Sequence, residues 1–378
     1  MKKILIIGAI NNPHICRLIK SIKQYDCDNL LLFDGFNTEL YKNENNSLFN
    51  TSYQVKSYFH CFLYKIYIIR TICIYIDIII SFLRIKNKYD ICNIHYPTLY
   101  SGILLPFIKS KTTTIIVSPW GSDVYRITNK DYKLVKRLYN AATYVTVPPI
   151  KFREDVQKKF SIPKSKFIDL GFGSEIINEL IDSHSNNNAA KEKLGLNNKY
   201  IITCGYNASA AQNHLYIIKA LTKIKNQLPY NALLLFPMTY VRNDITYINK
   251  VKHTLSNSGF EYIVYEEYLE NSEILNIRLA TDIFIHIQDT DAYSATIQEF
   301  LLTDTIVFNG AWTRYPNLET NGIPYLLVNN ISDLDHDILG YLNKSRTCHI
   351  SEDCKKTIKT LSWNNKGKEW YHFLKEYE

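Results

Sequence analysis

Short apolar runs alternate with helix-like segments along nearly the whole chain, and this alternation restricts the possible folds most. The first run, Ile4–Ile7, ends at Gly8, and a helix running to about residue 24 separates it from a second run at 29–33. A strand, a loop, a helix and a strand in this order are typical of a doubly wound parallel sheet. The pattern restarts at residue 199 with further predicted strands, at 199–204, 232–236, 262–265, 282–287 and 305–308. The predicted fold class is therefore α/β, with two Rossmann-like parallel-sheet domains.

The length of the chain supports two domains. Its 378 residues, of which 46% are hydrophobic, can form two cores, since a domain usually holds roughly 100–200 residues. The polar, asparagine-rich segment at 183–189 is typical of a linker. We expect a first domain over 1–185, a second over 186–355 and a final amphipathic segment over 356–378.

The net charge restricts the expected binding partners, and the cysteines indicate the cellular compartment. The 44 Lys and Arg residues exceed the 36 Asp and Glu residues by a net charge of +8, which suits an anionic membrane surface or a diphosphate substrate. No nucleic-acid-binding signature occurs, so nucleic acid is not an expected partner. None of the eight cysteines forms a C-x-x-C pair, which favours reduced thiols in a cytoplasmic protein. No signal peptide precedes the first predicted strand, which agrees with that location.

The segment Tyr58–Leu83 is strongly apolar and aromatic. Lys65, Arg70 and Asp77 interrupt it, whereas a membrane span needs about 20 mostly apolar residues. We favour a buried or membrane-surface helix over a span, and two short helices beneath the sheet are the remaining alternative.

An acidic motif follows the predicted strand at 282–287. Asp291 and Glu299 are separated by seven residues, which include Ser294, Ala295 and Thr296. A strand, a polar loop and a helix N-terminus form a natural anion site. With Asp291 in the loop and Glu299 in the helix, the two carboxylates can flank one cleft about two turns apart.

This motif resembles the E-x7-E motif of the retaining glycosyltransferases of the GT-B superfamily (glycosyl transferases group 1), with Asp in the first position. The resemblance implies two Rossmann-like domains facing a cleft and a last helix that crosses back to the first domain. It also implies metal-independent transfer from a nucleotide-sugar donor, with Asp291 holding sugar hydroxyls and Glu299 the ribose. The segment 236–240 further resembles the bacterial 4-acetamido-4,6-dideoxygalactosyltransferase, an inverting enzyme.

The resemblance places donor-binding residues in three loops of the second half. They are Gly205, Asn207, Gln212, Asn213 and His214 after the strand at 199–204, Pro237 and Met238 at the end of the next strand, and Tyr268 and Leu269 beside the nucleotide base. Ser294, Ala295, Thr296 and Glu299 of the acidic motif complete the expected donor-binding residues. The family usually has an Arg and a Lys-Gly pair in the first loop, and this chain has neither. The helix dipole, His214, Arg242 or Arg314 would then neutralise the diphosphate. Alternatively, the first two segments are ordinary loops after a strand, without a binding role. The segment with Tyr268 and Leu269 is alternatively a solvated acidic loop.

Acceptor-binding residues are expected in the first half. They are Asn11, Asn12 and His14 after the first strand, His95 after the strand at 91–95, and Trp120, Gly121 and Ser122 after the strand at 114–117. The last three, with Asp123, resemble the His-Gly-Ser-Asp turn of these transferases. Asp123 is the expected base if the enzyme inverts, or else it caps a helix. His95 is alternatively a structural histidine.

Two cofactor hypotheses are less favoured. Asp289 and Asp291 form a D-x-D triplet, which holds a divalent cation in other glycosyltransferases, but its position before Glu299 favours the metal-independent class. The nucleotide-binding pattern G-x-G-x-x-G is absent, which argues against NAD.

The sequence therefore predicts a bacterial glycosyltransferase of surface polysaccharide synthesis, such as that of O-antigen or capsule. The acceptor would be a saccharide or a polyprenol-linked saccharide at the inner face of the membrane, where the protein would be peripheral. A nucleotide-sugar epimerase of the same fold and a non-catalytic carbohydrate- or membrane-binding protein remain as alternatives.

Overall fold

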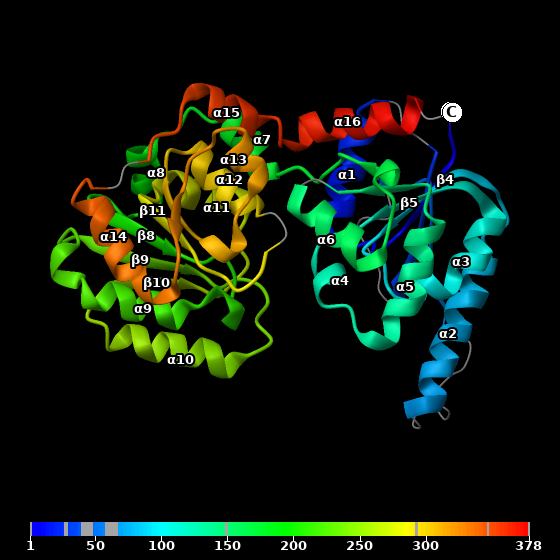
Figure 1. Cartoon of the computed structure of the whole chain (residues 1–378), viewed down its shortest axis with the longest axis horizontal. Helices are drawn as coiled ribbons and strands as arrows, with labels where there is room; N and C mark the ends of the chain where they lie inside the picture. The colour runs from blue at the N-terminus through cyan, green and yellow to red at the C-terminus, as the bar shows by residue number, and fades with distance from the viewer. Residues whose placement is uncertain are drawn as a thin grey trace. The chain divides into compact units, whose positions relative to one another are not determined.

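The chain forms two compact units, each with its own parallel sheet (Figure 1). In the computed structural model the described residues are 2–25, 29–38, 48–56, 67–147, 150–291, 294–345 and 348–376. The first unit comprises Met1–Gly173 and Trp363–Glu378, and the second comprises Ser174–Ser362. Two parallel sheets with helices confirm the predicted α/β class.

The sheet of the first unit has the order β3-β2-β1-β4-β5-β6-β7. Its strands are β1 Ile4–Ile7, β2 Leu30–Thr38, β3 Thr51–Val55, β4 Tyr89–His95, β5 Thr112–Ser118, β6 Tyr144–Thr146 and β7 Phe167–Ile168. Its helices are α1 Pro13–Lys23, α2 Tyr67–Leu83, α3 Leu99–Lys111, α4 Ser122–Tyr125, α5 Asn129–Ala141, α6 Ile150–Phe160 and α16 Trp363–Glu376. All four residues of β1 are buried, as expected of a central strand covered on both faces. The strand order reverses between β1 and β4.

The sheet of the second unit has the order β10-β9-β8-β11-β12-β13. Its strands are β8 Tyr200–Cys204, β9 Ala232–Pro237, β10 Glu261–Tyr265, β11 Ile283–His286, β12 Ile306–Gly310 and β13 Leu326–Val328. Its helices are α7 Glu175–Asp182, α8 Asn187–Lys193, α9 His214–Lys223, α10 Ile245–Ser256, α11 Asn271–Ala280, α12 Ala295–Leu302, α13 Pro316–Thr320, α14 Leu334–Leu342 and α15 Glu352–Lys359. Here the order reverses between β8 and β11.

The borders of the units differ from the expected ones. The second unit begins at Ser174 rather than at residue 186, because α7 belongs to it: Ile177 packs in a core with Phe284 and Phe300. The polar segment at 183–189 therefore lies inside this unit. A polar composition marks exposure, which any surface loop has, and does not by itself mark a domain border.

The last helix, α16, belongs to the first unit and lies beside α1 (Figure 1). Trp363 and Trp370 are buried in the core with residues of β1 and α1, and Trp370 Nε1 donates to the Gly171 carbonyl at 2.9 Å. Gly367 permits the close approach, since a Cβ atom there would lie 2.3 Å from Ser21 Cβ. The helix begins at Trp363 rather than near residue 356.

Helix α2 accounts for the described part of the apolar segment at 58–83, and residues 58–66 lie outside the described part. Within the described residues, no helix is both long and apolar enough to cross a membrane. The six cysteines in the described part of the chain are free thiols, four of them buried.

Candidate functional site

Predicted site residues collect where the strand order of each sheet reverses. Ligands of open parallel sheets bind outside the carboxyl ends of the strands at such points. In the second unit, Gly205 follows β8 while Asp289 and Asp291 follow β11. In the first unit, Asn11 and Asn12 follow β1, and His95 ends β4.

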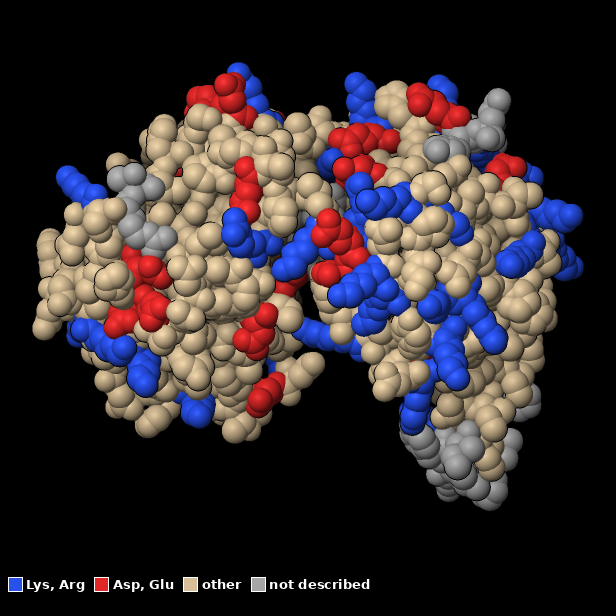
Figure 2. All heavy atoms as spheres, in the orientation of Figure 1, with Lys and Arg blue, Asp and Glu red and all other residues tan. Residues whose placement is uncertain are grey.

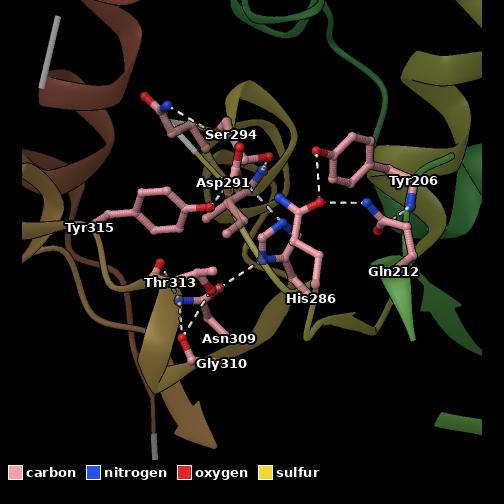
Figure 3. Close-up of polar contacts among 12 residues, drawn as sticks. Tyr206, Gln212, His286, Asp291, Ser294, Asn309, Gly310, Thr313 and Tyr315 are labelled. Carbon is pink, nitrogen blue, oxygen red and sulfur yellow. Dashed lines mark hydrogen bonds and ion pairs between the residues drawn. The ribbon is translucent and has the colours of Figure 1, made fainter. Parts of the chain in front are cut away.

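Asp291 lies beside His286, which ends β11, and Tyr315, which follows β12 (Figure 3). The Tyr315 hydroxyl donates to Asp291 Oδ2, and His286 Nε2 lies 3.7 Å from the same oxygen. His286 is the last residue of β11 and is fully buried. Tyr315 lies before α13, beyond the end of β12, and it is also buried. Sequence reasoning placed Asp291 at the site but missed His286 and Tyr315.

Hydrogen bonds fix the tautomer of His286. Asn309 Nδ2 donates to the carbonyls of Gly310 and Thr313, so Asn309 Oδ1 is the acceptor for His286 Nδ1 at 2.7 Å. The proton is therefore on Nδ1 in the neutral ring. Burial lowers the pKa of His286, while Asp291 and Asn309 act in the opposite direction. Nε2 consequently presents a lone pair near the Asp291 carboxylate.

Neutral groups occupy the loop after β8, where the resemblance implies an Arg and a Lys. Tyr206 O–H and Gln212 Nε2 both donate to Gln288 Oε1, at 3.2 and 2.6 Å (Figure 3). The Tyr206 ring also stacks on His286, with the centroids 5.7 Å apart. Trp312 Nε1 donates to the Gln288 carbonyl at 2.8 Å. This hydrogen-bonded trio orders the loop after β8 without supplying positive charge.

Helix α9 begins directly after this loop. Gly205 has φ +65°, and a Cβ atom there would lie 2.9 Å from both Gln212 Oε1 and His214 Nε2, so this position requires glycine. Asn213 adopts the left-handed conformation at the helix start, and its Nδ2 donates to Asp289 Oδ1 and the Ile287 carbonyl. The helix N-terminus is thus tied to the loop after β11.

The expectation that His214 neutralises a diphosphate is wrong. The side chain is fully buried, and burial lowers its pKa to about 3, so the ring is neutral at physiological pH. Its Nδ1 lies 3.2 Å from the Tyr247 hydroxyl. The backbone N–H groups of His214 and Leu215 point at that same hydroxyl. His214 therefore shapes the start of α9 instead of carrying charge.

The two arginines expected to serve as alternatives are engaged elsewhere. Arg242 bonds the carbonyl and carboxylate of Glu266. Arg314 pairs with both carboxylate oxygens of Glu319, at 2.8 and 2.7 Å. Both pairs are partly exposed, so they are weak and exchangeable.

Glu299 lies in α12, as predicted, but it is part of a buried ion pair. Arg278 Nε donates to Oε2 at 2.9 Å, and Ser174 Oγ donates to Oε1 at 2.7 Å. The predicted helix start is also found, because Ser294 caps α12 and its Oγ accepts from the Ile297 N–H group. Ala295 and Thr296 form the first turn of the helix. The ribose role of Glu299 stays a prediction, and both of its oxygens already accept a bond.

Most of the remaining residues predicted to bind the donor have buried side chains. Pro237 ends β9, and Met238 is fully buried in the core, with its N–H group bonded to the Tyr265 carbonyl. Leu269 packs in a second core, whereas Tyr268 is exposed. Asn207 is buried, and its Oδ1 accepts from the Ser209 N–H group. The Met238 and Leu269 side chains therefore stabilise the fold.

The first unit collects rings at the carboxyl ends of its strands. His14 opens α1, and the Asn12 side chain caps that helix by accepting from the His14 N–H group. The His14 ring lies 5.4 Å from Trp120 and 5.1 Å from Phe172 between centroids. Asn11 is exposed beside them. Phe172 was not among the predicted site residues, because its flanking glycines indicate only a loop.

His95 is buried among these rings. Both of its ring nitrogens lack a hydrogen-bond partner within the described ranges, as does Trp120 Nε1. Burial lowers the pKa of His95 to about 3, and the nearby His14 adds to the effect. His95 is thus a neutral group with unmet hydrogen-bonding capacity.

Asp123 shapes the turn after β5. Its Oδ1 accepts from the N–H groups of Trp120 and Gly121, at 2.9 and 2.8 Å. Gly121 caps the short helix α4 with φ 115°, a conformation that favours glycine. Burial raises the pKa of Asp123 to about 6. Ser122 Oγ is exposed and donates to the Tyr96 hydroxyl at 3.1 Å.

Metal-ligating side chains do not gather at either site. Across the described ranges there is no group of three or more His, Cys, Asp or Glu residues that could hold a metal ion. Asp289 and Asp291 have separate partners, Asn213 and Tyr315.

Comparisons with known proteins found one matching family model and several structures with a similar fold. Residues 3–148 match the family described as Glycosyl transferase 4-like. A search of curated protein sequences gave no match. The fold is similar to Anabaena Alr3699/HepE, crystallised with UDP and glucose, at a TM-score of 0.69 and 14% identity with 100% of both chains covered.

Two further solved structures have a similar fold. Sucrose-phosphate synthase from Thermosynechococcus elongatus has a TM-score of 0.73 and 12% identity, covering 100% of this chain and 99% of the other. The lipopolysaccharide outer core galactosyltransferase WaaB has a TM-score of 0.68 and 11% identity, covering 98% and 99%. The structural likeness confirms the predicted fold, and the match over residues 3–148 agrees with the predicted class of glycosyltransferase.

Proposed function

We propose that this glycosyltransferase moves a sugar from a nucleoside diphosphate to a saccharide or lipid-linked saccharide in bacterial surface polysaccharide synthesis. The observation that carries the proposal is the polar cluster around Asp291, next to the start of α9 at the reversal point of the second sheet. The second unit binds the donor and the first binds the acceptor. The UDP and UDP-glucose complexes of HepE support a donor of this kind.

The donor-binding groups are hydrogen-bond donors and dipoles. The start of α9 offers backbone N–H groups to the leaving diphosphate. The Tyr247 hydroxyl accepts from these N–H groups in the structure, so it must move away or accept alongside the diphosphate when the donor binds. Asp291 accepts hydroxyls of the transferred sugar while the Tyr315 hydroxyl, which donates to the same carboxylate, holds its position. Through the resemblance, we propose retention of configuration, a ribose role for Glu299 and transfer without a metal ion.

A membrane surface is the proposed location of the acceptor. Ile72, Ile76 and Leu83 are exposed on one side of α2 at a spacing of four and seven residues, which is one helix face. Lys86 and Lys88 follow the helix, and both are exposed. Figure 2 shows further basic side chains over α5 and α6 of the same unit. Apolar side chains flanked by basic ones suit an anionic bilayer.

The decisive test is nucleotide binding measured by thermal unfolding. We expect UDP or UDP-glucose, or the matching derivative of another base, to stabilise the protein by about 2.7 kcal/mol at 100 times its dissociation constant. An Asp291→Asn variant should keep the response to the free diphosphate and lose the extra response to the sugar nucleotide. If no nucleotide diphosphate or nucleotide sugar stabilises the parent, the donor assignment is refuted.

One observation favours a second candidate, a non-catalytic carbohydrate-binding protein. Tyr206, Gln212 and the neutral His214 supply no charge where a diphosphate would need it. Such a protein would bind saccharides and show no nucleotide response. A nucleotide-sugar epimerase would instead convert its substrate without any acceptor, so product analysis with and without a saccharide separates all three.

A further inference from the structure

Four rings, each from a segment that follows a different strand, line the carboxyl edge of the first sheet. His14 follows β1, Tyr96 follows β4, Trp120 follows β5 and Phe172 follows β7. The centroids of Trp120 and Tyr96 lie 5.4 Å apart, and those of Trp120 and Phe172 lie 5.7 Å apart. We call these four side chains the aromatic edge. Its rings are exposed or half-buried, so part of their surface is accessible.

Polar atoms with no partner lie directly behind the aromatic edge. They are both ring nitrogens of His95, the Trp120 Nε1 atom and Asp123 Oδ2, none of which has a hydrogen-bond partner among the described residues. His95 is 1% exposed, and its ring lies 6.2 Å from Trp120 and 6.0 Å from Phe172. Buried polar atoms are usually hydrogen-bonded, so several without partners in one place point to a bound polar ligand.

The backbone of Tyr96 adds a third observation. This bulky residue has φ 54°, a conformation that residues other than glycine adopt rarely and that collects at ligand sites. Its N–H group bonds the Ser118 carbonyl, and its hydroxyl accepts from Ser122. The strained residue is thereby fixed beside Trp120.

We infer that the aromatic edge binds the C–H face of a pyranose ring of the acceptor, with the polar atoms of His95 and Trp120 available for its hydroxyls. The inference rests on the proposed acceptor role of the first unit. Aromatic faces bury apolar area, while a few polar atoms orient the ligand. A lipid chain would leave the polar atoms unmet. A phosphate would meet neutral rings and, in Asp123, a carboxylate.

Saturation-transfer NMR with simple sugars tests this directly. The probes are the methyl pyranosides of glucose, galactose and N-acetylglucosamine. At least one should receive saturation at its ring protons and bind the parent, and Phe172→Leu should weaken that binding at least fivefold. Phe172→Tyr, which restores a ring face, should bind nearly as well as the parent.

Tyr371→Leu is the matched control. Tyr371 stacks on Tyr25 at the end of α1, with the centroids 5.2 Å apart, and this stack lies at the opposite end of α1 from the aromatic edge. This variant should bind the sugar like the parent, and thermal unfolding shows whether each variant is folded. Trp120→Leu provides a second edge variant if Phe172→Leu fails to fold.

Three results would overturn the inference: no pyranoside binds, Phe172→Leu and Trp120→Leu bind as the parent does, or free uridine replaces the sugar at this edge. The UDP response of the second unit is measured in parallel. If UDP fails to bind while the pyranoside binds at the edge, the proposed donor role fails and the aromatic edge stands. If UDP binds and the pyranoside does not, the proposed donor role stands and the inference about the aromatic edge fails.

Discussion

Glu299 shows how a residue can occupy the predicted position and have different local chemistry. Its spacing from Asp291 was evident from the sequence, but its partner Arg278 lies 21 residues away on another helix. Nothing in the sequence pattern links α11 to α12. Arg278 also lies over the Phe300 ring, at 4.5 Å from the centroid. The buried ion pair therefore ties α12 to α11.

Replacing Glu299 should destabilise the second unit. Glu299→Gln leaves the buried Arg278 guanidinium without its counter-charge, which costs about 3–5 kcal/mol for pairs of this kind. The matched control is Glu319→Gln in the exposed pair with Arg314, expected to cost about 0–1 kcal/mol. Urea unfolding measures both. Equal losses would show that the Arg278 pair is solvated, and Glu299 would then be open to a ribose.

Buried histidines should make stability depend on pH. The pKa values of His95 and His214 are lowered to about 3, whereas an unfolded histidine titrates near 6.5. The unfolded chain thus binds more protons below pH 6.5, and the free energy of unfolding should fall by up to about 1.4 kcal/mol per pH unit for each histidine. Asp123 acts in the opposite direction. Because its pKa is raised to about 6, the folded state binds the extra proton between about pH 6 and 4, which offsets the loss of stability from one histidine.

Denaturant unfolding at pH 7 and pH 5 checks this dependence. His214→Gln should lose less stability on acidification than the parent. His253→Gln, at an exposed position of α10, should behave as the parent does. A parental slope that is unchanged by His214→Gln would contradict the buried, neutral assignment.

At the scale of elements, the sequence predicted most strands because their apolar pattern is local. β1, β4, β8 and β11 lie within two residues of their expected bounds. The groups around Asp291 could not be predicted in the same way. Tyr315 and Asn309 reach the site only because β11 and β12 pair in parallel, with His286 opposite Asn309, and register is a tertiary property.

Helix α2 supports a prediction at this scale. Ile76→Asp should reduce binding to anionic vesicles, because it removes exposed apolar surface and adds repulsion by the anionic lipids. Raising the salt concentration should release the parent, since each basic residue near such a surface contributes about 1 kcal/mol that is screened within a Debye length.

Tyr230→Asp is the control for vesicle flotation, because Tyr230 is fully exposed in the second unit. It should bind as the parent does. If the parent fails to bind at low salt, α2 has another partner, and a soluble saccharide becomes the favoured acceptor.

At the scale of the whole chain, the first unit is discontinuous: its last helix comes after the whole second unit. Composition alone placed the unit border in the wrong segment, because the apolar residues that decide it, such as Ile177 and Trp370, are recognised only by what they pack against. Each unit nevertheless has its own core, so a change in one core should leave the ligand response of the other intact.

Trp370→Ala tests this independence. Removing a buried tryptophan should cost the first unit about 3–5 kcal/mol, since Trp370 packs in the core beside α1. Hydrogen exchange should then speed up in β1 and α1 of the variant, while UDP or the nucleotide found to bind still slows exchange in β8 and α9. Phe284→Ala, a matched change in the core of the second unit, should give the opposite pattern. Loss of nucleotide protection in Trp370→Ala would mean that the donor site depends on the first unit, and the assignment of donor binding to Ser174–Ser362 alone would be wrong.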